Sequence, residues 1–250
     1  MKAYKYGLYA SLVIFCLMVP ARGSETARSF ITGVTAYQNG NYETAIDAFS
    51  AIVDSGVQNA ELFYNLGNAY LKNDDLGHAV LWYERALKRN PDDPDLKFNL
   101  DYALSLIKDQ KAETTLPLPR IFFFWKYQLS ADTIQWSAIV LNLIFWLLLV
   151  CSHIWQRKRL RQTAYLVLVF VLVFTSTALY NYYERTYRPL AVILPPEVSI
   201  RSGLSDTATE LFVLHAGTKV RVEKEQNDHY RIYFTDGKIG WVKKELVGRI

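Results

Sequence analysis

Four histidines are the residues of this chain with the widest chemical range, since imidazole can bind a metal or act as a general base. His78, His153, His215 and His229 fall in different sequence contexts. None has a second ligand-type residue at a spacing typical of a metal site, and none stands in a recognisable catalytic motif. The sequence therefore predicts no metal site and no histidine-based catalysis.

Two carboxylate pairs, Asp74-Asp75 and Asp92-Asp93, could in principle carry acid–base chemistry. Both pairs stand at the turns of a helical pattern, where acidic residues commonly cap helix N-termini. The chain also lacks a phosphate-binding loop, a nucleophile elbow and a zinc-binding helix motif. We therefore expect no enzyme activity and no cofactor.

The basic stretch HIWQRKRLRQ, residues 153–162, raises the question of a polyanion site. The flanking soluble parts argue against nucleic acid, because residues 24–119 hold 14 acids and 8 bases, and residues 186–250 hold 8 acids and 10 bases. The stretch instead separates two apolar blocks, which is typical of a short cytoplasmic loop. Its four cations are Arg157, Lys158, Arg159 and Arg161.

The two apolar blocks are each long enough to cross a bilayer, which takes about 20 residues. We predict a transmembrane hairpin formed by helices at residues 134–153 and 163–183, joined by a cytoplasmic basic loop at residues 154–162. Two helices that are apolar all round favour this over a pair of buried core helices. The two cysteines, Cys16 and Cys151, both lie in apolar blocks, so neither a disulfide framework nor a thiolate metal site is available.

Residues 1–23 have the pattern of a secretory signal peptide, with two lysines, a 13-residue apolar core and small residues at possible cleavage sites. An uncleaved anchor is the alternative, although the apolar core is short for a full span. Export of the following segment and the positive-inside bias of the basic loop give the same orientation. Both soluble parts would then lie on the export side of the membrane.

Asn142 is a polar residue in the middle of the first predicted span, where an unpaired amide is costly. In a hairpin centred near residue 157 or 158, its depth corresponds to about residue 173 on the second span, within a turn of Thr175 and Ser176. We expect a hydrogen bond between the two helices there. The alternative is that the amide faces a partner protein.

An internal repeat with a period of 34 residues precedes the membrane segments. Gly33 aligns with Gly67, Ala45 with Ala79, and Phe49 with Tyr83. This period and pattern resemble the tetratricopeptide repeat, in which each unit is a pair of antiparallel helices. The glycine and alanine positions would let the two helices approach closely, and the aromatic residues would fill the gap between units. The second unit also has Leu66, Tyr70, Ala86 and Pro91 at signature positions.

We place the repeat domain at residues 24–110, with units at about 26–59 and 60–93 and a capping helix at 95–110. The cap is expected to have a more polar outer face. The resemblance implies that partner proteins or peptides bind the concave face formed by the first helix of each unit. The candidate partner-binding residues on that face are Tyr37, Tyr64, Asn65, Asn68, Lys72 and Asn99.

Residues 111–133 follow as a linker and interfacial segment. The Thr/Pro-rich part favours an extended chain, and the aromatic run FFFW that follows it is typical of a segment lying at a membrane surface. The linker would hold the repeat domain close to the bilayer.

Residues 189–250 change to short runs of alternating polar and apolar residues, which predict five or six strands in a small closed barrel. The stretches VSIRSGLSD, AGTKVRV and TDGKIGWVKKELV resemble the bacterial SH3-like domain, although His229 stands where that family usually has tryptophan. Tyr230 and Trp241 are the candidate ligand residues, with core packing as the alternative for Trp241. The residues at the motif positions are Arg201, Ser202, Gly203, Gly217, Gly237, Gly240 and Trp241.

The expected fold is thus a multidomain α + β membrane protein with an α-helical tetratricopeptide solenoid, a two-helix transmembrane hairpin and a small SH3-like β-barrel. This order of parts resembles the BatE-type proteins of the Bacteroides aerotolerance operons. The resemblance implies a protein of a Gram-negative bacterial inner membrane. It also implies that the protein acts together with membrane-anchored von Willebrand A-domain proteins and a MoxR-type ATPase.

Two functions are compatible with these features. The first is a non-catalytic scaffold that binds partner proteins in the periplasm through its repeats. The alternative is an envelope sensor whose SH3-like domain binds peptidoglycan or its peptides. Retention of the C-terminal domain on purified cell wall would distinguish the sensor from the scaffold.

Overall fold

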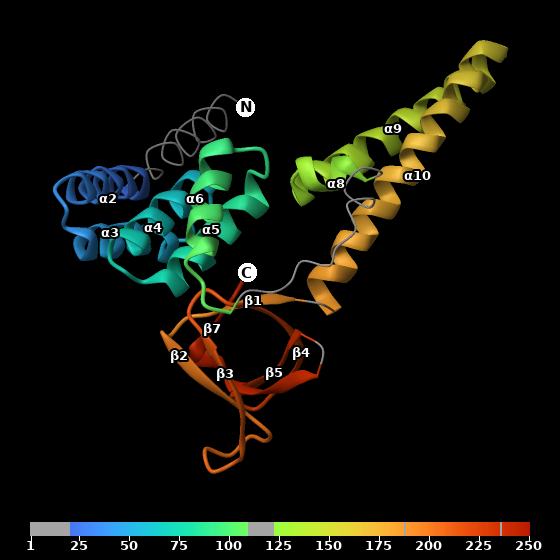
Figure 1. Ribbon diagram of the computed structural model, residues 1–250. Coiled ribbons are helices and arrows are strands. Elements are labelled where there is room, and N and C mark those ends of the chain that lie inside the picture. The colour runs from blue at the N-terminus through green and yellow to red at the C-terminus, as the bar shows by residue number, and fades with distance from the viewer. Residues whose placement is uncertain (1–20, 110–122, 188, 236) are drawn as a thin grey trace, which may run out of the picture. The chain divides into compact units, whose positions relative to one another are not determined.

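The computed structural model describes residues 21–109, 123–187, 189–235 and 237–250. The chain divides into two compact units, residues 1–58 and 59–250. The predicted signal peptide, apart from residues 21–23, and residues 111–122 of the predicted linker lie outside the described residues. Figure 1 shows the helices and strands along the chain.

The first compact unit contains two helices, α2 (Ala21–Gln38) and α3 (Tyr42–Asp54). Gly40, with a φ of 78°, makes the tight turn between them, in a conformation that glycine adopts without strain. Gly33 on α2 lies directly under the ring of Phe49 on α3, and a Cβ at this position would come within 2.5 Å of the ring. The unit therefore has the close helix approach that the repeat pattern predicts.

The second compact unit begins with α4 (Ala60–Lys72), α5 (Leu76–Arg89) and α6 (Pro94–Ser105). Each helix starts at a side-chain cap: Asn59 accepts from Leu62 N–H, Asp75 from His78 N–H, and Asp93 from Leu96 N–H. The acidic pairs at the repeat turns thus include helix caps, as the sequence predicted.

The interior of this helical pair repeats the arrangement found in the first unit. Tyr83 is fully buried, and a Cβ on Gly67 would lie 2.6 Å from its ring. Ala79, also fully buried, is the second small residue between α4 and α5. The small residues at these two positions therefore set the spacing of the helices, as the sequence pattern predicted.

Two long apolar helices, α9 (Ala131–Trp155) and α10 (Lys158–Tyr187), run antiparallel to one another (Figure 1). Ile134 and Ala138 on α9 and Ala164 and Val171 on α10 are buried, whereas most of the other apolar side chains are exposed. Residues 131–155 and 158–184 are long and apolar enough to cross a membrane. The exposed apolar surface is what two spans in lipid would present.

The connection between these helices is shorter than the predicted loop at residues 154–162. Helix α9 continues to Trp155, Gln156 adopts a left-handed conformation with a φ of 46°, and α10 begins at Lys158. Lysine, arginine and glutamine are good helix formers, so the basic stretch extends α10 instead of forming a longer loop. All four cations of this stretch are exposed.

A short helix, α8 (Phe124–Gln128), lies beside α10. Trp125 donates from Nε1 to Thr177 Oγ1 at 3.2 Å, and Lys126 forms a 2.7 Å ion pair with Glu184. The Lys126 ammonium also lies 4.2 Å from the ring centre of Tyr180. These contacts hold the aromatic segment against the C-terminal part of α10, and its position at a membrane surface stays a prediction.

The predicted hydrogen bond between Asn142 and the second span is not formed. The Asn142 side chain is exposed and has no hydrogen-bond partner in the part of the chain that the structure describes. Asn142 follows the buried Ala138 by one turn, but it stands at the edge of that buried side, where its side chain remains exposed.

The C-terminal residues form an antiparallel sheet of seven strands among the described residues, one or two more than predicted. In the order β3-β2-β6-β5-β4-β1-β7, neighbouring strands are hydrogen-bonded. Within the described residues no hydrogen-bonded pairing joins the two edge strands, β3 and β7, so the sheet does not close on itself. The SH3-like barrel therefore remains a prediction. The strands are β1 (Leu190–Ile193), β2 (Glu197–Arg201), β3 (Glu210–His215), β4 (Lys219–Gln226), β5 (His229–Thr235), β6 (Lys238–Lys243) and β7 (Val247–Arg249), with a 3₁₀ turn, η1 (Lys244–Leu246).

The sheet packs against the repeat helices within the second compact unit. Asp109, which follows α6, accepts hydrogen bonds from the backbone N–H of His215 at 2.6 Å and from the hydroxyl of Thr218 at 2.8 Å. The Nδ1 atom of His215 lies 3.0 Å from the other carboxylate oxygen. Glu84 on α5 forms a 2.8 Å ion pair with Lys219 on β4. Polar contacts therefore join two parts of the chain that the apolar hairpin separates in sequence.

Close backbone contacts complete this interface. A Cβ on Gly77 of α5 would meet the backbone of Leu194, at 2.7 Å from its Cα atom. A Cβ on Gly217 would lie 2.9 Å from Ile107, and Gly248 lies against Leu81. Three glycines therefore allow the repeat helices and the sheet to approach more closely than larger residues would.

The Asp109 contacts predict a pH-dependent stability. Burial raises the pKa of the Asp109 carboxyl, but the hydrogen bonds from His215 and Thr218 outweigh burial and hold the pKa below its ordinary value of about 3.9. The folded protein then binds fewer protons here than the unfolded chain does. The stabilisation is present above the unfolded pKa and is lost as the pH falls through the folded pKa.

We therefore expect the midpoint of urea unfolding to fall below about pH 4 more steeply in the natural protein than in an Asp109→Asn variant. Unfolding curves at pH 6 and at pH 3 would measure the difference. Equal slopes in the two proteins would show that Asp109 contributes no such stabilisation.

Candidate partner-binding surface

Three of the predicted partner-binding residues meet in one polar cluster between α4 and α6. The Nδ2 atom of Asn99 donates to Tyr64 Oη at 2.8 Å and to Asn68 Oδ1 at 3.1 Å. The hydroxyl of Tyr83 donates to the same Asn68 oxygen at 2.6 Å. The rings of Tyr64 and Tyr83 lie 6.1 Å apart. Tyr64, Asn68 and Asn99 are half-buried. Residues that are far apart in sequence therefore hold one another in defined positions.

The cluster leaves unused hydrogen-bonding capacity. Asn68 uses its oxygen but not its Nδ2 atom, and Asn99 uses its Nδ2 atom but not its oxygen, within the described residues. The unused N–H of Asn68 and the unused oxygen of Asn99 are a donor and an acceptor, the two kinds of group that pair with a peptide unit. The arrangement can therefore bind the backbone of an extended segment without demanding a particular side chain.

An apolar stripe on α6 extends this surface, and the sequence analysis missed it. Phe98, Tyr102 and Leu106 are spaced four residues apart and are 74%, 54% and 49% exposed. They follow Tyr64, Asn68 and Lys72 by 34 residues each, so they occupy the same positions one repeat later. Extending the period to the third helix would have identified them. The stripe occupies positions of the predicted concave face, so the more polar outer face of the cap stays a prediction.

The remaining predicted residues contribute less to this cluster. Lys72 is exposed at the end of α4, one turn beyond Asn68, and Asn65 is half-buried on the same helix. Tyr37 belongs to the first compact unit, where its ring packs edge-on against Tyr42 at 5.5 Å. The structure thus brings together Tyr64, Asn68 and Asn99, and places Lys72 beside them on α4.

Replacing Tyr83 with phenylalanine tests whether the cluster is held together from inside. The change removes the hydroxyl that donates to Asn68 while keeping the buried ring, so we expect a loss of about 1 kcal/mol in the free energy of unfolding. Urea denaturation measures the loss. The matched control is Tyr102→Phe, whose exposed side chain predicts a change within about 0.5 kcal/mol. Equal effects of the two changes would contradict this role of Tyr83.

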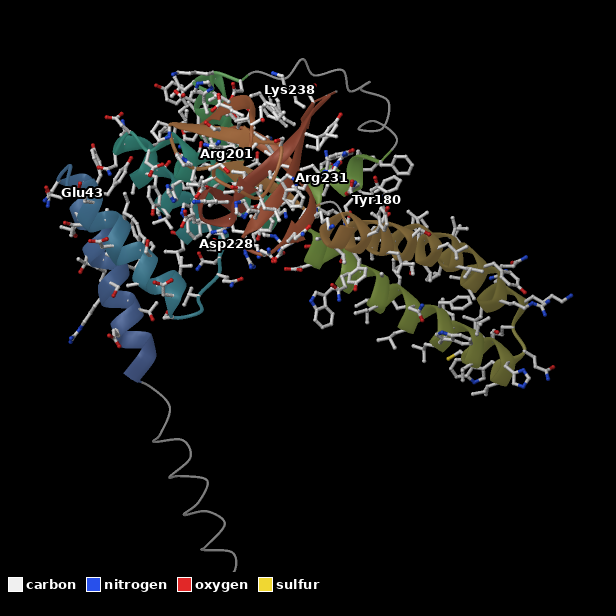
Figure 2. The ribbon with its side chains drawn as sticks, turned by 90° about the horizontal axis from the view of Figure 1, so that it is seen from below. Glu43, Tyr180, Arg201, Asp228, Arg231 and Lys238 are labelled. Atoms are coloured by element: carbon white, nitrogen blue, oxygen red, sulfur yellow. The ribbon has the colours of Figure 1, made fainter. Side chains whose placement is uncertain are left out.

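The two candidate ligand residues on the sheet differ in accessibility. Tyr230 is 8% exposed, belongs to the core of the sheet domain and lies under Lys244 and Arg249. Trp241 on β6 is half-buried and stands opposite Arg201 on β2 and Arg231 on β5. Directly opposed residues of antiparallel strands share a face, so Trp241 is flanked by two arginines. Figure 2 shows Arg201 and Arg231 on the sheet domain.

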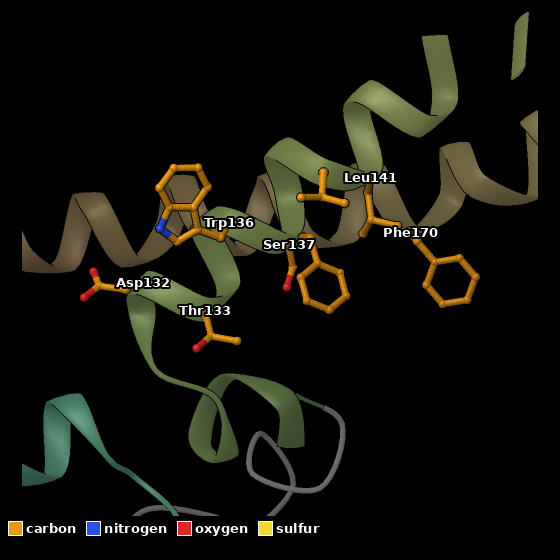
Figure 3. Close-up of a pocket in the computed structure, with 8 residues that line it drawn as sticks. Asp132, Thr133, Trp136, Ser137, Leu141 and Phe170 are labelled. Atoms are coloured by element: carbon orange, nitrogen blue, oxygen red, sulfur yellow. The ribbon is translucent and has the colours of Figure 1, made fainter. Parts of the chain in front are cut away.

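The apolar hairpin also carries a shallow pocket of about 650 Å³ between α9 and α10. Figure 3 shows Asp132, Thr133 and Ser137 on α9 at this pocket, with Trp136 and with Phe170 from α10. Among the described residues, no group of three or more histidine, cysteine or carboxylate side chains could hold a metal ion. The pocket is apolar apart from its polar end, which gives it no evident catalytic chemistry.

Comparison with known proteins bears on the helical part of the chain. Residues 32–94 match the family described as tetratricopeptide repeat. The chain is 24% identical over 98 residues to the Photosystem I assembly protein Ycf3 of Synechococcus sp. strain CC9605, covering 38% of this chain and 57% of that protein. It is 23% identical over 112 residues to Ycf3 of strain CC9311, covering 44% and 62%.

The chain thus spans about three fifths of the length of the curated relatives that it matches. The match to the repeat family and the paired helices with small residues at Gly33 and Gly67 lead to the same conclusion. Residues 32–94 form a tetratricopeptide-type helical region, a kind of module that generally binds protein partners.

Proposed function

We propose that this protein is a non-catalytic, membrane-anchored scaffold that binds a partner protein through its tetratricopeptide-type helices. The observation that carries the proposal is the surface on α4 and α6, where the hydrogen-bonded carboxamides of Asn68 and Asn99 keep one unused donor and one unused acceptor within the described residues, and where α6 carries exposed apolar side chains. Such a surface suits a peptide segment with apolar side chains. The relatives named as assembly proteins are in keeping with a scaffold role.

Membrane anchoring by the hairpin of α9 and α10 is part of this proposal. The two helices are long and apolar enough to span, and their outward side chains are mostly apolar. The contacts of Asp109 with His215 and Thr218 link the segments before and after the hairpin. Two segments in direct contact lie on one side of a membrane, which supports a hairpin that enters and leaves on the same side.

The orientation follows from the basic stretch between the two helices. Four exposed cations and no acid favour the cytoplasmic side for this turn, so the repeat helices and the sheet would lie in the periplasm of a Gram-negative cell. The resemblance to BatE-type proteins then suggests partners among von Willebrand A-domain membrane proteins, acting with a MoxR-type ATPase in an envelope stress complex.

Site-specific photo-cross-linking in living cells tests the proposal. A photo-reactive residue in place of Lys72, at the edge of the candidate surface, should capture a membrane-anchored partner protein. The same residue in place of Asp92, which is exposed at the turn between α5 and α6, is the matched control. No adduct from position 72, or the same adduct in equal yield from both positions, would overturn the assignment of the binding surface.

A second candidate function rests on the sheet domain, whose resemblance is to bacterial SH3-like domains. Trp241 between Arg201 and Arg231 offers an aromatic face with cations on both sides, which suits carboxylate-bearing peptides such as those of peptidoglycan. Sedimentation of the full-length protein with purified cell wall tests this function. Retention that is lost in a Trp241→Ala variant would support the sensor, and no retention would exclude it.

A further inference from the structure

Asn142 is a carboxamide at the middle of α9 for which the described residues provide no hydrogen-bond partner. Its neighbours on the exposed surface of that helix are apolar, with Leu143 65% and Trp146 59% exposed. If α9 spans the membrane, as proposed above, the amide faces hydrocarbon, where neither water nor a described side chain supplies its hydrogen bonds. Such a group favours association with a partner that does.

The surface around Asn142 has the spacing of a helix-packing face. Residues spaced alternately four and three positions apart form one stripe along α9. This spacing is the heptad repeat of coiled coils, in which the side chains of two helices interlock. This stripe borders the side of α9 on which Ile134 and Ala138 are buried, and all its members except Leu149 are exposed. The stripe is made of Gln135, Ile139, Asn142, Trp146, Leu149 and His153.

We propose that a second copy of this chain covers the stripe, with the two α9 helices parallel and Asn142 of one copy paired with Asn142 of the other. Copies inserted in the same direction are related by an axis along the membrane normal, so identical residues meet at identical depth. A carboxamide has both a donor and an acceptor, so two identical amides satisfy one another. A second copy therefore supplies the required group at the required depth.

Disulfide cross-linking of the full-length protein in membranes tests the proposal. In a background with Cys16→Ser and Cys151→Ser, we introduce Ile139→Cys on the stripe and, as the matched control, Val140→Cys on another face of α9. Both positions are exposed, at 42% and 50%. We expect oxidation to give a dimer from position 139 and little from position 140. Equal yields, or no dimer from position 139, would overturn the proposed face.

A second measurement isolates the amide. In the Ile139→Cys background, Asn142→Leu should lower the dimer yield, and in reconstituted vesicles it should raise the dimer dissociation constant roughly tenfold. Asn142→Gln, which keeps a carboxamide, should retain more of the association than the leucine variant. Equal association in the three proteins would show that the amide does not drive pairing. A cross-link from position 139 to a different membrane protein would overturn the assignment of a second copy as the partner.

Failure of this inference is distinguishable from failure of the proposed function. Extraction with alkaline carbonate first establishes whether each variant is inserted in the membrane. A protein that is not inserted contradicts the anchoring on which this inference rests. An inserted monomer contradicts only the pairing through Asn142, because the binding surface on α4 and α6 is tested separately from position 72.

Discussion

Replacing Gly77 with alanine is expected to loosen the contact between the repeat helices and the sheet. The added Cβ would meet the backbone of Leu194, which cannot move aside as the end of a flexible side chain could. Such overpacking costs about 1–3 kcal/mol. We expect this loss to fall on the interface, because the three atoms nearest to the added Cβ all belong to Leu194.

Hydrogen exchange provides the measurement. The backbone N–H of His215 donates across the interface to Asp109, so its exchange should become faster in Gly77→Ala, while the N–H of Ile232 in the buried centre of β5 keeps its protection. The control is Gly203→Ala, whose Cβ would be 3.5 Å from Ala208, an ordinary contact. Unchanged exchange at His215 in Gly77→Ala would show that the two parts do not depend on this approach.

Replacing both Phe98 and Tyr102 with alanine should abolish most partner binding without unfolding the protein. Both side chains are exposed, so the free energy of unfolding should change little. Exposed aromatic residues at the centre of a binding surface commonly each contribute more than 1 kcal/mol to affinity, and the pair predicts a loss of tenfold or more.

The yield of the photo-cross-link from position 72 measures this loss. Lys97→Ala, an exposed change elsewhere on α6, is the control and should keep the full yield. Full capture in the double variant would mean that the apolar stripe on α6 is not part of the binding surface.

Local patterns in the sequence were sufficient to predict the helical parts. The 34-residue period predicted the close approach of the two helices at Gly67, but Tyr83, which was expected to fill the gap between units, lies against this glycine within its own unit. The apolar runs similarly predicted α9 and α10, with the difference that the basic residues continue the helix and shorten the turn. The same period, extended once more, predicts the stripe that includes Phe98.

The contacts between the repeat helices and the sheet could not be predicted in this way. Asp109 and His215 are separated by 106 positions, and no periodicity relates a residue after a helix to a strand beyond two apolar spans. The position of Tyr230 in the core likewise depends on strand register, which alternation alone does not fix. Whether Asn142 finds a partner on α10 depends on how α9 is rotated about its own axis. The sequence predicts the depth of Asn142 along the span but not this rotation.

The placement of both soluble parts on one side of the membrane is the central claim of this account, and labelling of single cysteines tests it most directly. In the cysteine-free background, Lys72→Cys, Lys238→Cys and Arg159→Cys place an exposed thiol on the repeat helices, the sheet and the basic turn. A membrane-impermeant maleimide applied to cells with a permeabilised outer membrane should label positions 72 and 238, and position 159 only after the inner membrane is opened. Labelling of positions 72 and 238 from opposite sides would contradict the account.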